Sequence, residues 1–415
     1  MKVVHLNTGI RRSSAPYRLH EALRERGVES KILVLNAGEK LNEVYPVRRN
    51  LFYKCKRKIY SLLRQQVLKR FRPTEYMPFT ALPVGINLDR QEAIREADII
   101  CLHWVCGDFM SPETIRKLLK LGKPVLMACH DNYSFTGGCH VRLGCERYQK
   151  GCGRCPQLCV QKEKDITSRL AKKKKRIFNY PNLYVLSPSR WMDHNVEKSA
   201  VLGGHRHFIL PNAIDTHIFR PYKKEQVRAE LGLDREGFVV LAGLKANEKI
   251  PYNGTSFLWE MFRKLDDIKY RKRLGNQKIQ AVVFGVEQLE PKCSLPMQNL
   301  GYITDENLLA KVYSAADVYV ITSLEDSFNQ TAAECMACGT PVAAFCSGGI
   351  ADVIDHRKNG YLAEYKNIDD LMEGIIFANG NHLGEAAREK IEEQFSFRVI
   401  GERFVHIVEQ INHVK

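Results

Sequence analysis

Residues 317–352 constrain the fold of this chain more than any other part of its sequence, which reads there DVYVITSLEDSFNQTAAECMACGTPVAAFCSGGIAD. Val318–Ile321 is a short β-branched apolar run, and a second apolar run covers Pro341–Phe345. The segment Asn329–Cys338 between them has helical character and stops at Gly339, a typical residue just past a helix end. The stretch therefore predicts a strand, a helix and a second strand, which is the repeating unit of a parallel α/β sheet.

The polar turn of this unit is the first candidate site. In an open parallel sheet, ligands bind beyond the carboxyl ends of the strands, where Ser323–Phe328 would lie. The N–H groups that open the helix at Phe328–Gln330 suit a phosphate group. Asp326 precedes the helix and Glu334 follows eight residues later. Two carboxylates so placed would hold hydroxyl groups on either side of a diphosphate.

The segment EDSFNQTAAECMACGTPV resembles the Glu-x7-Glu element of family 4 retaining glycosyltransferases, which have the GT-B fold. In that family the first acidic residue contacts the donor sugar and the second binds the ribose hydroxyls of the nucleotide. The resemblance implies the first role for Asp326, or for its neighbour Glu325, and the second for Glu334. The family's usual Gly-Phe-Gly reads Ser327-Phe328-Asn329 here. The alternative interpretation is a helix that carries two solvated acids.

The amino-terminal half carries a second candidate site. Its segment HWVCGDFMSPETIRKLLKLGKPVLMACHDNYSFTGGCH resembles family 4 enzymes that make bacterial surface polysaccharides. The predicted strands Ile99–Leu102 and Val125–Cys129 end in His103 and His130, so both histidines would lie on one rim of a parallel sheet. In the family a histidine before Asp lines the reaction centre near the transferred sugar, and the resemblance implies this role for His130. The alternative for each histidine is a structural role.

The turn after the first predicted strand, Lys2–Asn7, is a third candidate. Relatives have a glycine-rich turn there, whereas this chain has only Gly9 followed by Arg11 and Arg12. The two guanidinium groups would contact a phosphate, or they form an exposed, solvated pair. The predicted acceptor and phosphate region comprises Gly9, Arg11, Arg12 and His103.

The predicted strand Phe238–Ala242 begins the carboxy-terminal half. Family members usually carry a Lys-Gly pair after this strand that binds donor phosphates, but this chain has Asn253-Gly254. Lys245 and Lys249 are the available substitutes. The predicted donor-binding residues are Glu334, Lys245, Lys249, Ser327, Phe328, Asn329 and Gln330.

The resemblance extends over nearly the whole chain and implies an α/β protein of the GT-B class. Two Rossmann-like domains would face each other across a cleft, and 415 residues suffice for two hydrophobic cores. We expect an acceptor-binding domain at 1–220, a nucleotide-sugar-binding domain at 221–385, and a helix at 386–415 that crosses back to the first domain.

The charge distribution suggests a membrane surface. The net charge is +16, and Arg48–Arg72 carries ten basic residues and no acid. Apolar residues recur in it at helical spacing, at Phe52, Ile59, Leu63, Val67 and Phe71. This helix either lies on an anionic membrane, helped by the basic run Lys172–Arg176, or packs on its own domain with a solvated basic face. Nucleic-acid binding is not favoured, because no RNA-binding motif accompanies the charge.

No apolar run approaches the ~18 residues of a membrane span, and the first residues lack the pattern of a secretory signal. We therefore expect a cytoplasmic protein, with peripheral attachment to the inner face of the plasma membrane as the further hypothesis.

The chain has thirteen cysteines, and four lie within 17 residues: Cys139, Cys145, Cys152 and Cys155. In a reducing compartment, clustered thiols favour a metal over disulfides. Four thiolates match tetrahedral zinc in a closed, structural site, with disulfides or buried free thiols as the alternatives.

The predicted reaction is transfer of a hexose, with retention of configuration, from a nucleotide diphosphate sugar to a glycan or polyprenyl-linked acceptor. The nucleotide sugar is a co-substrate, and no catalytic cofactor is expected. The alternative from another class is a non-catalytic GT-B protein that binds a partner or a glycan.

Overall fold

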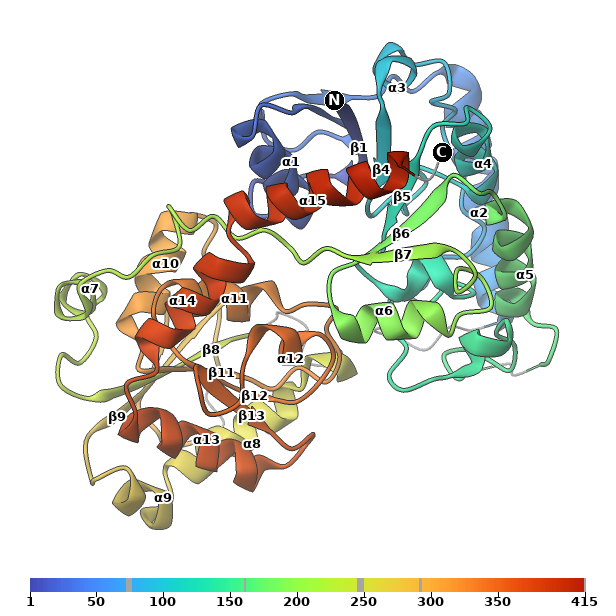
Figure 1. Ribbon diagram of the computed structural model, residues 1–415. Coiled ribbons are helices and arrows are strands. Elements are labelled where there is room, and N and C mark those ends of the chain that lie inside the picture. The colour runs from blue at the N-terminus through green and yellow to red at the C-terminus, as the bar shows by residue number, and fades with distance from the viewer. Residues whose placement is uncertain (72–76, 160–161, 245–249, 291–292, 414–415) are drawn as a thin grey trace. The chain divides into compact units, whose positions relative to one another are not determined.

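The computed structural model describes residues 1–71, 77–159, 162–244, 250–290 and 293–413 (Figure 1). It divides into two compact units: Met1–Asn212 with Ile400–Lys415, and Ala213–Val399. We call these the N-terminal unit and the C-terminal unit. Their boundaries fall after Asn212 and before Ile400, where the sequence predicts 220 and 386. Lys245 and Lys249 lie outside the described residues.

The N-terminal unit is built on a seven-stranded parallel sheet of order β3-β2-β1-β4-β5-β6-β7. Its strands are β1 (Lys2–Gly9), β2 (Glu29–Asn36), β3 (Val44–Pro46), β4 (Ile99–Leu102), β5 (Val125–Ala128), β6 (Leu183–Ser187) and β7 (Arg206–Ile209). Its helices are α1 (Ala15–Glu25), α2 (Leu51–Phe71), α3 (Glu92–Glu96), α4 (Pro112–Leu119), α5 (Ile166–Phe178) and α6 (Arg190–Glu197), with the 3-10 turns η1 (Asn132–Phe135) and η2 (Arg147–Lys150). The strand order reverses between β1 and β4, so ligands are expected beyond the carboxyl ends of these two strands.

Helix α15 (Phe397–Asn412) contributes its residues from Ile400 onward to the N-terminal unit. It packs closely on α1, since a Cβ atom at Gly401 would lie 2.8 Å from the carbonyl oxygen of Ala22. Arg26 and Glu402 form an ion pair at 2.8 Å beside this contact. The last helix therefore joins the core of the first half of the chain.

The C-terminal unit contains a six-stranded parallel sheet of order β10-β9-β8-β11-β12-β13. Its strands are β8 (Phe238–Gly243), β9 (Ile279–Phe284), β10 (Met297–Asn299), β11 (Val318–Ile321), β12 (Val342–Phe345) and β13 (Gly360–Ala363). Its helices are α7 (Lys224–Leu231), α8 (Thr255–Leu265), α9 (Ile268–Arg273), α10 (Glu306–Ala315), α11 (Gln330–Ala337), α12 (Ile350–Val353), α13 (Ile368–Gly380) and α14 (Gly384–Gln394), with the 3-10 turn η3 (Pro251–Asn253). The strand order reverses between β8 and β11.

Both faces of this second sheet are buried. Along β8, Val239 and Leu241 belong to one apolar cluster, whereas Val240 and Ala242 belong to another on the opposite face. Burial on both faces explains why the strands are continuous apolar runs in the sequence. Two parallel sheets of this kind confirm the predicted α/β class with two Rossmann-like domains.

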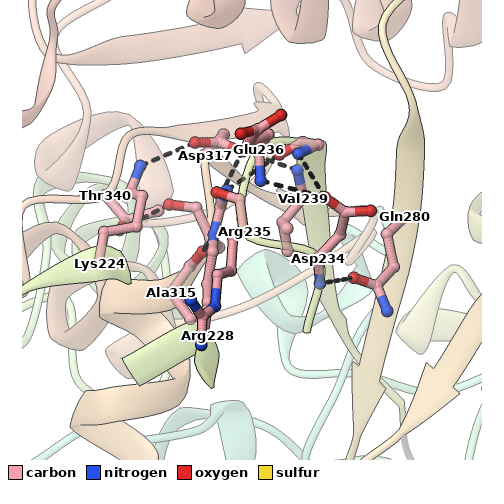
Figure 2. A network of polar contacts seen from close by, with 12 residues as sticks. Lys224, Arg228, Asp234, Arg235, Glu236, Val239, Gln280, Ala315, Asp317 and Thr340 are labelled. Carbon is pink, nitrogen blue, oxygen red and sulfur yellow. Dashed lines mark hydrogen bonds and ion pairs between the residues drawn. The ribbon is translucent and has the colours of Figure 1, made fainter. Parts of the chain in front are cut away.

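A partly buried polar network joins α7 to the amino ends of β8 and β11, the two central strands of the second sheet (Figure 2). Arg228, 3% exposed, donates to the carbonyl oxygen of Ala315 at 2.8 Å and to the Asp317 carboxylate at 2.6 Å. The same carboxylate accepts from the Val239 N–H at 2.7 Å and from Lys224 at 2.8 Å. The Arg228 guanidinium is buried whereas the Asp317 side chain is 23% exposed, and these hydrogen bonds offset the cost of removing the arginine charge from water.

Helix α2 packs on its unit through a polar side and leaves an apolar side exposed. The Tyr53 hydroxyl donates to the carbonyl oxygen of Asp108 at 2.7 Å, and Arg64 forms an ion pair with the Asp108 carboxylate. The large apolar residues Leu51, Phe52, Ile59, Leu62 and Leu63 are exposed, from 45% at Leu63 to 76% at Phe52. We call these five residues the α2 outer face. Within the described residues, no helix has both the length and the apolar character needed to cross a membrane.

Candidate active site

The two predicted histidines meet at the carboxyl edge of the first sheet. Nδ1 of His103, which follows β4, lies 2.9 Å from Nε2 of His130, which follows β5. A third imidazole, His5 of β1, extends the row, with its Nδ1 2.8 Å from Nε2 of His103. The rings stack with centroids 5.1 Å and 5.2 Å apart. Sequence reasoning missed His5, although a histidine inside a buried strand next to the predicted rim was the available signal.

Burial keeps these imidazoles neutral. It lowers the pKa of His5 to about 3 and that of His130 to about 4, and it lowers the pKa of His103 well below its ordinary value. Removing a charged ring from water is unfavourable, and the neighbouring rings add repulsion between positive charges at His5 and His103. Each ring is therefore a neutral group with one N–H donor and one acceptor nitrogen.

A small cavity opens beside His130, and Asp131 organises its wall. One oxygen of the Asp131 carboxylate accepts from Trp104 Nε1 at 2.9 Å and contacts His140 Nδ1 at 2.6 Å. The other oxygen accepts from the Tyr133 N–H at 2.8 Å and caps η1. Trp104 remains 41% exposed although its indole N–H is held by Asp131.

The basic run Lys172–Arg176 was expected to help bind an anionic membrane, but its central residue, Lys174, does not reach the surface. It is buried in the wall of the same cavity and donates to the carbonyl oxygens of Tyr133 and Thr136. Burial lowers the pKa of its ammonium group to about 8. This lysine supports the turn after β5 rather than a surface, because three N–H donors can satisfy several inward carbonyl groups.

Gly9, Arg11 and Arg12 lie at the end of β1, on one side of the strand-order reversal. Gly9 pairs with Asn36 of β2, and the two arginine side chains are exposed. The structure therefore brings the predicted phosphate region to the same sheet edge as His103.

The turn between β11 and α11 is closed by its own polar groups. Oδ1 of Asp326 accepts from the N–H groups of Phe328 at 3.2 Å and Asn329 at 2.9 Å. Oδ1 of Asn329 in turn caps α11 by accepting from the Ala332 N–H at 3.0 Å. The expectation that the N–H groups of Phe328 and Asn329 point to a phosphate is therefore wrong for this structure, because Asp326 occupies both.

Asn329 explains why the family's second glycine is dispensable here. Its φ of 68° is left-handed, a conformation that asparagine tolerates better than other side chains. The structure corrects the prediction that the Phe328 side chain binds the donor. This side chain is buried and packs edge-on against Phe395, with ring centroids 5.4 Å apart. It is a core residue and offers a ligand only its backbone.

Glu334 lies on the second turn of α11 and is 4% exposed. One carboxylate oxygen accepts from the Tyr313 hydroxyl at 3.3 Å, and the other accepts from Gln330 Nε2 at 3.0 Å. Gln330 is itself partly exposed, as are Glu325 and Ser327 in the turn. The Gln330 side chain thus lies between the buried Glu334 carboxylate and the surface as one of its hydrogen-bond partners.

The loop after β8 packs beside the Asp326 turn. A Cβ atom at Gly254, whose φ is 69°, would lie 1.7 Å from the carbonyl oxygen of Thr322. The Leu324 N–H donates to the carbonyl oxygen of Tyr252 at 2.9 Å. Glycine is required here for close approach of two backbones, which brings the segments after β8 and β11 together at the strand-order reversal.

Comparison with known proteins decides the family. The family described as Glycosyl transferases group 1 matches residues 240–378. An uncharacterised glycosyltransferase of Methanocaldococcus jannaschii is 31% identical over 350 residues, which cover 78% of this chain and 84% of the relative. This chain belongs to the group 1 glycosyltransferases.

Solved structures agree with the fold of this glycosyltransferase. Sucrose-phosphate synthase from Thermosynechococcus elongatus has a TM-score of 0.63 and 16% identity, and the match covers 100% of both chains. Anabaena HepE in complex with UDP-glucose has a TM-score of 0.60 and 14% identity, covering 99% of this chain and 100% of that chain. The glycosyltransferase therefore has the predicted GT-B type of fold.

The cysteine-rich loop of the glycosyltransferase does not form the predicted zinc site. Cys139, Cys145, Cys152 and Cys155 line one small cavity as free thiols, but no three or more His, Cys, Asp or Glu side chains among the described residues are arranged to hold a metal. Burial raises the pKa of Cys139 and Cys152 to about 12.

Asp165 holds this loop by hydrogen bonds. Its carboxylate accepts from the Cys155 N–H at 3.0 Å and from the Thr167 N–H at 2.8 Å, where it caps α5. A buried carboxylate that satisfies backbone donors supplies local order that the sequence analysis assigned to a metal.

Proposed function

We propose that this glycosyltransferase transfers a hexose, with retention of configuration, from a nucleotide diphosphate sugar to a glycan or polyprenyl-linked acceptor. The observation that carries the proposal is the acidic pair Asp326 and Glu334 beyond β11, where the strand order reverses. Uridine is the favoured base, because HepE of similar fold binds UDP-glucose. Synthesis of bacterial surface polysaccharides is the proposed setting.

Glu334 is proposed to bind the ribose hydroxyls. Each carboxylate oxygen can accept more than one hydrogen bond, so the Tyr313 contact can persist while ribose takes the place of Gln330. Movement of the partly exposed Gln330 side chain would then open the buried carboxylate to the nucleotide. Asp326, or Glu325 beside it, is proposed to face the transferred sugar.

The leaving group is a diphosphate, which departs readily once its growing charge is neutralised. Cationic side chains positioned before the reaction provide this stabilisation without reorganisation. The proposed candidates are Lys245, Lys249, Arg11 and Arg12. His130 is proposed to contact the transferred sugar, and holding the acceptor hydroxyl close supplies much of the remaining acceleration. The nucleotide sugar is the co-substrate, and the proposal includes no catalytic cofactor.

Attachment to the cytoplasmic face of a membrane is part of the proposal. The α2 outer face presents five large apolar side chains, and exposed Lys54, Arg57 and Lys58 lie on the same helix. Apolar residues enter the lipid boundary while basic residues attract anionic headgroups at about 1 kcal/mol each. A polyprenyl-linked acceptor would be met at that surface.

The test is a donor panel of UDP-, GDP- and ADP-hexoses, scored by release of the nucleoside diphosphate. Turnover with one nucleotide class is expected, and NMR of the product of that donor should show the anomeric configuration of the donor. Inverted product would overturn the retaining assignment. Tight nucleotide binding with no release from any donor would favour a non-catalytic protein.

A further inference from the structure

The row formed by His5, His103 and His130 determines whether Nδ1 of His130, the nitrogen at the outer end of the row, carries a proton. We propose that His5 and His103 are positioning residues that hold His130 with its proton on Nδ1, so that His130 acts as an N–H donor and not as a base. The inference rests on the proposed function only in assigning a sugar oxygen as the partner of that donor.

Hydrogen bonding permits only two proton arrangements along the row. A neutral imidazole has one N–H and one bare nitrogen, so each ring that donates on one side must accept on the other. In the first arrangement His5 Nδ1 donates to His103 Nε2, and His103 Nδ1 donates to His130 Nε2. The proton of His130 then sits on Nδ1. In the second arrangement every bond is reversed, and Nδ1 of His130 is bare.

The surroundings of His5, at the buried end of the row, decide between the two proton arrangements. Nε2 of His5 is buried and has no hydrogen-bond partner among the described residues. The second arrangement places a proton on this nitrogen and creates a buried, unsatisfied N–H group, whereas the first leaves only a bare acceptor there. Orphaned buried N–H groups are the rarer of the two in folded proteins, so the first arrangement is favoured.

The surroundings of the row support neutral rings throughout. His20 lies edge-on to His5 with centroids 6.2 Å apart, and its Nδ1 is 2.7 Å from the Ser30 hydroxyl. Burial also lowers the pKa of His20, to about 4. Asp131 adjoins His130 in sequence and engages Trp104, His140 and Tyr133.

Because the His5 end of the row is buried, the row cannot carry a proton from His130 to solvent on that side. A proton accepted at Nδ1 of His130 and relayed inward would have to leave through His5 Nε2, which is buried. The row therefore fixes the tautomer of His130. The Nδ1–H group of His130 can then donate a hydrogen bond to a sugar oxygen. No bond to carbon forms or breaks at His130 in this role.

The test is the tautomer of His130 in protein labelled with ¹⁵N at histidine, read from long-range correlations between ring nitrogens and carbon-bound protons. The His130 resonances are assigned by their loss in His130→Gln. We expect a protonated Nδ1 and a bare Nε2 in the wild-type protein at pH 7.5. A protonated Nε2 and bare Nδ1 would overturn the proposal.

Two variants of His103 separate positioning from packing. His103→Phe keeps a flat ring but removes the donor, so His130 should lose the Nδ1-protonated signal in favour of the Nε2-protonated form. His103→Asn keeps an amide N–H near the position of Nδ1 and should restore the wild-type tautomer. An unchanged tautomer in His103→Phe would contradict the proposal, and the exposed His217→Phe serves as the matched control.

If His103→Phe does not fold, His5→Leu tests the same idea from the inner end. It leaves Nε2 of the buried His103 as the inner end of the row without its His5 partner, so the same preference for a bare inner nitrogen should keep His130 protonated on Nδ1. A His130 that becomes Nε2-protonated, or a mixture of tautomers, in His5→Leu would overturn the role of the inner end. The NMR result does not depend on transfer, so an inactive protein would refute the proposed function and leave this inference standing.

Discussion

Asp326 has two separable roles, and two substitutions distinguish them. Its carboxylate accepts from the N–H groups of Phe328 and Asn329, which belong to buried residues. Asp326→Ala removes the acceptor and the charge, whereas Asp326→Asn removes the charge and keeps an acceptor oxygen. In turns, asparagine and aspartate side chains both accept hydrogen bonds from backbone N–H groups a few residues further on.

The structure gives the size of the stability effect. Buried N–H groups left without an acceptor cost about 1–3 kcal/mol. We therefore expect Asp326→Ala to lower the free energy of unfolding by about 2 kcal/mol. For domains of about 150–250 residues this lowers the Tm by roughly 4–8 °C.

The same two variants report on catalysis. A charge-assisted hydrogen bond to the sugar contributes about 1.5–3 kcal/mol, so both variants should lose about 10- to 150-fold in kcat/KM. The assays are thermal unfolding followed by circular dichroism, and release of the nucleoside diphosphate from the donor. Asp326→Asn should keep the wild-type Tm while losing turnover.

Two outcomes would refute this reasoning. An equal loss of Tm in Asp326→Asn and Asp326→Ala would show that the turn does not depend on the acceptor oxygen of residue 326. Full turnover in Asp326→Asn would show that the charge has no role at the sugar and would transfer the assignment to Glu325.

Three further predictions concern other parts of the molecule. Asp317→Ala leaves the buried Arg228 charge unpaired and should lower the free energy of unfolding in urea by about 3–5 kcal/mol; adding Arg228→Met should recover much of this loss, and no recovery would contradict the pairing. Ile59→Glu with Leu63→Glu should abolish sedimentation with anionic liposomes at low salt; equal binding of the wild-type protein to neutral liposomes would exclude the electrostatic part. The folded-state pKa of His5, about 3, lies below its ordinary value of 6.5, so folded protein gains its proton later than unfolded protein. Stability should be complete above pH 6.5 and fall as the pH decreases from 6.5 toward 3. His5→Phe should weaken this dependence of Tm on pH, and the remaining part is expected from His20, His103 and His130, whose pKa values burial also lowers.

The strands were largely predictable because parallel strands buried on both faces read as apolar runs. The predicted runs Ile99–Leu102 and Val318–Ile321 coincide with β4 and β11. The meeting of His103 and His130 followed from their places after neighbouring strands. The place of His5 inside the first predicted strand was a signal, but its contact with His103 depends on the pairing of β1 with β4, which that local pattern does not specify.

Three features of the sites depended on tertiary contacts that the sequence does not display. Phe328 was assigned to the donor, but its ring packs on Phe395, which is far away in the chain. The apolar residues of α2 were expected along one stripe, yet the side that packs was set by Asp108, which engages Tyr53 and Arg64. The cysteine spacing suggested zinc because four thiols lie close together in the sequence. Sequence separation alone does not show whether their sulfur atoms are arranged to hold one metal ion.

The central claim is that the C-terminal unit binds the nucleotide through Glu334. The most direct test is calorimetric titration of UDP, GDP and ADP into the wild-type protein and into Glu334→Ala, with the exposed Glu389→Ala as the matched control. Loss of charge-assisted bonds worth about 1.5–3 kcal/mol should weaken binding of the preferred nucleotide about 10- to 150-fold. Glu389→Ala should bind it as the wild-type protein does. Unchanged affinity in a folded Glu334→Ala variant, or no binding of any nucleoside diphosphate by the wild-type protein, would contradict the account.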